Sequence, residues 1–139
     1  MHVYIGGAHN GKRQYVKNRL IESGNKTSYW MSGIELFETF RADNIPRGTI
    51  VVYDVEKGIA QTDLSEEELL KKASGVMKHP DVIFILTDIG RGIVPMEAEQ
   101  RELRDRCGRL YQMLMSQADD VTQIWYGLAK SLKKRGEIQ

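Results

Sequence analysis

The chain has 139 residues, of which 41% are hydrophobic and 28% charged, and its formal net charge is +1. This length fits one domain over residues 1–139 with a sizeable core. The near-neutral charge argues against nucleic-acid binding through bulk electrostatics, which needs a strong basic excess. The single cysteine, Cys107, excludes an internal disulfide and a cysteine-cluster zinc site.

No apolar stretch approaches the roughly 20 residues that cross a bilayer. The sequence opens on "HVYIGG", without a basic-then-apolar export segment. We therefore expect a cytoplasmic protein with neither membrane nor nucleic-acid partners.

A glycine-rich loop follows the first β-prone run, at residues 2–5, and a helical pattern at 11–23 follows the loop. The loop has the spacing G-x-x-x-x-G-K, with Lys12 as its lysine. Backbone N–H groups of such a loop and helix start converge on an anion, and the lysine reaches the outer phosphates of a nucleotide. We predict an ATP or GTP site formed by Gly6, Gly7, Ala8, His9, Asn10, Gly11, Lys12 and Arg13. The alternative is a tight turn that uses its glycines for positive φ.

Arg13 stands where such loops carry Ser or Thr, whose hydroxyl binds magnesium. A guanidinium has no acceptor atom, so a metal needs other oxygens. Asp54, which ends the apolar run 49–54, is the first candidate ligand for Mg²⁺, and Asp88, which ends the run 81–88, is the second. Lys12 and Asp54 are the predicted catalytic residues. Two alternatives stay open: each aspartate is a turn residue, or Arg13 itself pairs with phosphate and replaces part of the ion's charge.

The remaining elements follow in chain order. Residues 27–31 and 121–126 are further β-prone runs, and residues 33–42 favour a short helix. Ser65 and Glu68 form a capping-box pattern that opens a helix over 65–78. The longest helix is predicted over 96–117, and the basic tail 130–139 is interpreted as a solvated end.

Strands that alternate with helices predict an α/β fold: a three-layer, P-loop NTPase-like domain around a mostly parallel sheet of about five or more strands. Three of the β-prone runs are apolar on both alternating sets of positions, which is typical of strands covered on both faces.

The stretch "ILTDIGRGIVPMEAEQRELRDRCGRLYQMLMSQADDV" is a more specific signal. Its G-x-G-I-V-P loop and the helix pattern after it resemble the bifunctional adenosylcobinamide kinase / adenosylcobinamide-phosphate guanylyltransferase family of cobalamin biosynthesis. The opening "GGAHNGK" is similar to that family's G-G-A-x-x-G-K-S loop, except for the final hydroxyl residue. The resemblance covers residues 5–20 and 83–128.

The resemblance implies a RecA-like fold and an enzyme that first phosphorylates a corrinoid hydroxyl and then transfers GMP onto that phosphate. It implies a nucleoside triphosphate and a corrinoid such as adenosylcobinamide as partners, and a homo-oligomer. By position, Asp54 matches an acidic residue of the family, and Asp88 stands near another, where this chain is one residue shorter; Tyr111 replaces the family's usual Asn. Gly90 and Gly92 match the family's loop near the site; Arg91 between them is either a cation for the transferring group or an exposed arginine without a role.

The family's guanylyl transfer uses a histidine between the second and third strands. That segment has no histidine in this chain, whose three histidines are His2, His9 and His79. We therefore predict a kinase-type transferase that has lost the guanylyltransferase step. The alternatives are a non-catalytic nucleotide-binding or regulatory relative and a protein-interaction module in which the loop is only a turn.

Overall fold

The computed structural model describes residues 1–8, 11–24, 27–89 and 97–139. Its seven-stranded sheet has the spatial order β2-β3-β4-β1-β5-β6-β7. The strands β1 to β5 are parallel, and β6 and β7 continue the sheet antiparallel after β5. The strand bounds are β1 (His2–Gly6), β2 (Ser28–Ser32), β3 (Thr49–Tyr53), β4 (Val82–Thr87), β5 (Asp120–Trp125), β6 (Leu128–Lys134) and β7 (Glu137–Ile138).

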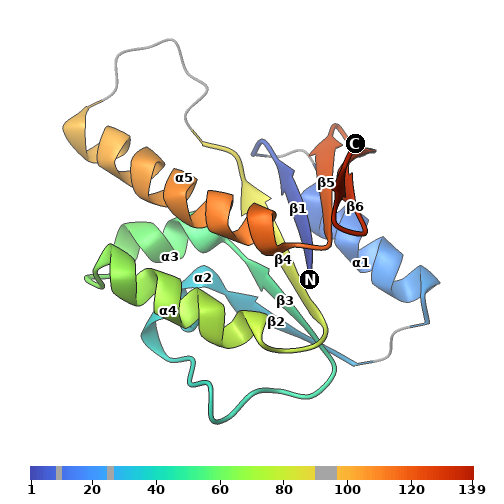
Figure 1. Ribbon diagram of the computed structural model, residues 1–139, viewed down its shortest axis with the longest axis horizontal. Coiled ribbons are helices and arrows are strands. Elements are labelled where there is room, and N and C mark those ends of the chain that lie inside the picture. Colours follow the sequence, from blue (N-terminus) through green and yellow to red (C-terminus); the bar gives the residue numbers. More distant parts are fainter. Residues whose placement is uncertain (9–10, 25–26, 90–96) are drawn as a thin grey trace.

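The helices lie on both faces of the sheet, which gives three layers (Figure 1). α1 packs on one face, where Val16 joins the buried side chains Tyr4, Val51, Ile85 and Ile124. The other helices cover the opposite face, over the larger core cluster. None of the described helices is long and apolar enough to span a membrane. The helix bounds are α1 (Lys12–Glu22), α2 (Gly33–Glu38), α3 (Val55–Gln61), α4 (Glu66–Met77) and α5 (Ala98–Gln117).

The predicted α/β class with a mostly parallel sheet is confirmed, and so are five of its strands. The capping box of α4 is present: Ser65 accepts from the backbone N–H of Glu68, whose carboxylate accepts from the N–H of Ser65. The helix expected over 33–42 ends earlier, at Glu38. α3, β6 and β7 were not predicted, and the tail interpreted as a solvated end forms these last two strands.

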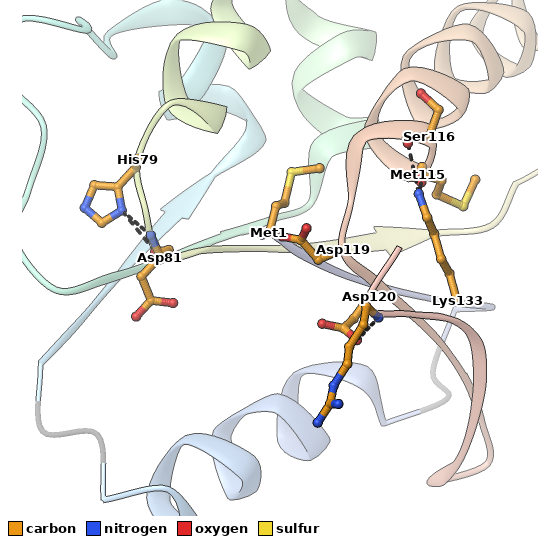
Figure 2. A network of polar contacts seen from close by, with 9 residues as sticks. Met1, His79, Asp81, Met115, Ser116, Asp119, Asp120 and Lys133 are labelled. Carbon is orange, nitrogen blue, oxygen red and sulfur yellow. Dashed lines mark hydrogen bonds and ion pairs between the residues drawn. The ribbon is translucent and has the colours of Figure 1, made fainter. Parts of the chain in front are cut away.

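The C-terminal strands are fastened to α5 and β5 by polar contacts (Figure 2). The Lys133 ammonium donates to the carbonyl oxygens of Met115 and Ser116, at 3.3 and 2.9 Å. These carbonyls belong to the last turn of α5, where a cation is favoured by the helix dipole and meets unpaired acceptors. The N–H of Arg135 donates to the Asp120 carboxylate at 3.2 Å.

α2 and α3 approach one another backbone to backbone at two glycines. A Cβ atom on Gly33 would lie 2.4 Å from the carbonyl oxygen of Asp54, and one on Gly58 would lie 2.4 Å from the backbone of Gly33. Only glycine permits this approach, which fixes the start of α3 against α2. These two glycines therefore let α2 pack directly against the backbone of Asp54.

We expect Gly33→Ala to lower the free energy of unfolding by about 1–3 kcal/mol, because the added methyl group meets backbone atoms that cannot rotate away. Urea unfolding at pH 7 measures this. Gly108→Ala is the matched control: a Cβ atom there meets nothing within 4 Å, so we expect α5 to gain about 0.5–1 kcal/mol. Equal stabilities of the Gly33→Ala protein and the wild type would contradict the close approach of α2 and α3.

Candidate nucleotide site

The carboxyl ends of three neighbouring strands bring the predicted site residues to one edge of the sheet. Gly6 at the end of β1 is in register with Thr87 at the end of β4. The N–H of Asp88 donates to the carbonyl of Gly6 at 2.8 Å, and β3, which pairs with β4, ends just before Asp54. Open α/β sheets bind their ligands at this edge.

The glycine-rich loop lies between β1 and α1, as predicted. Gly11 is the N-cap residue of α1, with φ 76° in the left-handed region, and α1 begins at Lys12. Lys12 is buried, and its ammonium turns back over the loop to donate to the carbonyl of Gly7 at 2.7 Å. Burial is also the main cause that lowers the pKa of Lys12. The geometry therefore holds the lysine beside the helix N-terminus.

The first turn of α1 is cationic, which is unusual for a helix start. It contains Lys12 and Arg13 and no acidic residue, and its N-cap residue, Gly11, has no side chain that could cap the helix. The positive end of the helix dipole and two cations repel one another unless an anion joins them. This helix start therefore has the electrostatics of an anion site.

Asp54 supplies one anion to this turn. It has φ 51° and ψ 40°, a left-handed conformation that aspartate tolerates, and its side chain does not cap α3. One carboxylate oxygen is 2.5 Å from Nη2 of Arg13, and the other is 3.5 Å from the Lys57 ammonium. The Arg13 guanidinium also lies over the ring of Tyr53, 4.5 Å from its centroid. The Asp54 carboxylate thus pairs with two cationic side chains.

A cavity of about 410 Å³ opens between the loop, α3 and β4. Its volume is within the usual range of small-molecule sites. It is lined by Ala8, Gly11, Lys12, Arg13, Gln14, Asp54, Glu56, Lys57, Ile85 and Thr87.

Glu56 and Lys57 are charged site residues that sequence reasoning missed. Glu56 lies in the first turn of α3, lines the cavity, and its Oε2 atom is buried with no hydrogen-bond partner among the described residues. Burial raises its pKa most strongly and Asp54 raises it further, against the attraction of Lys57 and Lys12. The sequence signal that could have revealed Glu56 is its position, two residues after Asp54, the aspartate that follows β3.

Tyr111 ties α5 to the end of β4 beside the site. Its hydroxyl donates to the carbonyl of Thr87 at 2.9 Å, and burial raises its pKa. Cys107, one turn earlier, is buried, and its pKa is raised to about 12, chiefly by burial, so the thiol is unreactive at neutral pH.

The charges around Asp54 bear on the predicted magnesium site. Within the described residues, no group of three or more His, Cys, Asp or Glu side chains could hold a metal ion. Asp54 lines the cavity, and Asp88 is not among its lining residues. Magnesium needs oxygen ligands at about 2.0–2.1 Å in near-octahedral array. Since both oxygens of Asp54 face cationic side chains, the residues present do not fit a magnesium ion at Asp54.

Several predicted residues lie outside the part of the chain that the structure describes. These are His9 and Asn10 of the glycine-rich loop, and Gly90, Arg91 and Gly92 of the second loop. Gly6, Gly7, Ala8, Gly11, Lys12 and Arg13 are described, and their assignment to nucleotide binding stays a prediction.

Residues 49–132, more than half of the chain, match the family model described as cobinamide kinase / cobinamide phosphate guanyltransferase. The chain belongs to this family. The match includes Asp54, Glu56 and α5, and the glycine-rich loop precedes it. The family supports nucleotide binding and a role in cobalamin biosynthesis.

Other comparisons add less. The search of curated proteins finds no match. Among solved structures, the crystal structure of the flagellar accessory protein FlaH from Methanocaldococcus jannaschii has 14% identity and a TM-score of 0.47, over 99% of this chain and 81% of that chain.

We expect Glu56→Gln to stabilise the protein at pH 8. Because its folded-state pKa is raised above the usual 4.5, the folded state binds more protons than the unfolded state between these two pKa values. Stability of the wild type therefore falls as pH rises through that window. Chemical unfolding from pH 4 to pH 8 measures the difference, which should shrink toward the acid end.

Glu67→Gln is the control for this substitution, because the Glu67 side chain is 82% exposed and its replacement should have almost no effect at either pH. A Glu56→Gln protein less stable than the wild type at pH 8 would show that the buried carboxylate is stabilising.

Proposed function

We propose that this protein is a nucleoside-triphosphate-binding phosphotransferase of the cobinamide kinase type. The observation that carries the proposal is the cationic start of α1, where Lys12 is buried beside the glycine-rich loop and faces a cavity at the carboxyl edge of the sheet. Phosphoryl transfer depends mostly on positioning and on neutralising charge, which backbone N–H groups and cations provide. Family membership supports a corrinoid such as adenosylcobinamide as the acceptor.

In this proposal the polyphosphate lies on the N–H groups at the start of α1, and Lys12 binds its outer phosphates. The ammonium has several N–H donors, so it can keep its bond to the Gly7 carbonyl while it donates to phosphate. The acceptor hydroxyl approaches the terminal phosphorus from the cavity. Magnesium held by Asp54 is not part of the proposal, because Asp54 is paired with Arg13 and Lys57.

Glu56 is positioned to take the proton of the acceptor hydroxyl. As the hydroxyl oxygen bonds to the terminal phosphorus, the bond from phosphorus to the bridging oxygen breaks and the nucleoside diphosphate leaves. The hydroxyl proton passes to the Glu56 carboxylate, whose raised pKa brings it closer to the operating pH. Glu56 lines the cavity from which the acceptor hydroxyl approaches.

We propose that the guanylyltransferase step is lost, because the segment between β2 and β3 carries no histidine. Imidazole suits a nucleotidyl intermediate, since it is nucleophilic when neutral and leaves readily when protonated. The cytoplasmic location and the self-association of the protein remain predictions from the sequence.

A second candidate is a nucleotide-binding or regulatory relative without turnover. The position of Arg13 favours this candidate, because Arg13 stands in place of the loop's Ser or Thr and forms an ion pair with Asp54. Turnover separates the two candidates: the kinase releases ADP or GDP when cobinamide is present, whereas the regulatory relative binds nucleotide and releases no product.

We expect Lys12→Ala to weaken ATP or GTP binding by about ten- to a hundredfold, because it removes a charge-assisted hydrogen bond to phosphate. Calorimetry with both nucleotides measures the binding. Lys17→Ala on the same helix is the control, since Lys17 lies over the ring of Trp30. Equal nucleotide affinity of the Lys12→Ala protein and the wild type would favour the reading of the loop as a plain turn.

We expect Glu56→Gln to lower kcat for cobinamide phosphorylation by about a hundredfold or more, because the proton acceptor is lost. The nucleotide dissociation constant should stay within a few fold. Steady-state turnover and calorimetry on the same preparation measure both. An unchanged kcat would remove Glu56 from the reaction.

A further inference from the structure

The disagreement between this site and a magnesium ion points to a different source of charge. We propose that the guanidinium of Arg13 takes the place of the divalent cation, so that the nucleotide's polyphosphate binds without a requirement for magnesium. This inference rests on the proposed nucleotide-binding function and states which cation that function uses.

Arg13 is held in place from two sides. Its guanidinium pairs with Asp54 at 2.5 Å and lies 4.5 Å from the centroid of the Tyr53 ring. Both partners come from the end of β3, where the sequence predicted the metal. The cation beside Asp54 is therefore the side chain of Arg13, which belongs to α1.

Arg13 keeps the capacity to bind phosphate while it holds this position. Its side chain is 48% exposed and lines the cavity, and the recorded ion pair engages one terminal nitrogen, Nη2. A guanidinium has several N–H donors in a planar fork that matches phosphate oxygens. Donors thus remain for a phosphate beside the one that Lys12 reaches.

Asp54 does not lose its last partner if Arg13 turns toward the nucleotide. The Lys57 ammonium lies 3.5 Å from the second oxygen of the same carboxylate. Leaving a buried or half-buried charge unpaired is what makes such rearrangements costly. With two cations on one carboxylate, one of them can move to the ligand while the other stays.

The charges around the cavity favour a metal-free polyphosphate. Lys12, Arg13 and Lys57 outnumber Asp54 and Glu56 among its lining residues. This positive excess repels a dication, whereas it attracts a triphosphate that carries no metal ion.

Calorimetric titration of ATP and GTP in excess EDTA and in excess MgCl₂ tests the inference. We expect the wild-type affinity to agree within about threefold between the two buffers. Arg13→Ser, which restores the usual hydroxyl and releases Asp54, should bind at least about tenfold more weakly in EDTA, and magnesium should recover part of that loss.

Two further variants separate the role of Arg13 from a loss of charge or of fold. Arg19→Ser removes a cation from the last turn of the same helix and should behave as the wild type in both buffers. Arg13→Lys keeps the charge without the planar fork and should give an intermediate affinity in EDTA. Thermal unfolding of each variant checks that it is folded.

The outcomes are distinct. A wild-type affinity that falls more than about threefold in EDTA, or an Arg13→Ser protein that keeps the wild-type affinity there, overturns the inference and leaves the proposed nucleotide-binding function standing. A wild type that binds neither nucleotide in either buffer overturns that function, and the inference with it.

Discussion

The parallel register of β1, β4 and β3 is the constraint on which the site depends. Main-chain hydrogen bonds between these strands, buried under helices on both faces, leave little freedom in where each strand ends. Gly6 and Thr87 are paired across β1 and β4, and β3 ends one residue before Asp54. A loop, a helix start and an acidic side chain from distant parts of the sequence therefore meet at one edge.

The charges at this edge lie around one cavity. Lys12 donates to the carbonyl of its own loop, Arg13 and Lys57 pair with Asp54, and Glu56 lines the same cavity with its Oε2 atom buried. In phosphate-binding loops the usual division of labour gives the lysine to the phosphates and the acidic strand end to the metal. Here an arginine one residue after the lysine pairs with the acidic residue at the strand end.

Sequence patterns predicted the elements whose signal is local. Three of the strands were predicted from runs that are apolar on both sides, α4 opens with its capping box, and the glycine spacing marks the loop before α1. α3 gave no such signal, because it is short, contains Gly58 and is held by packing against Gly33. Asp54 was found because it ends an apolar run. Glu56 was not, because a glutamate in a first helical turn looks like an ordinary dipole partner, and only the tertiary structure buries it.

The C-terminal strands β6 and β7 form one border of the sheet. β6 is exposed over most of its length and carries Lys130 and Lys134. Lysine-rich outer strands are one way in which natural sheets resist pairing with a strand from another molecule. Growth of the sheet into a fibre or a continuous intermolecular sheet is therefore disfavoured at this border, although Leu128 and Ile138 are exposed there.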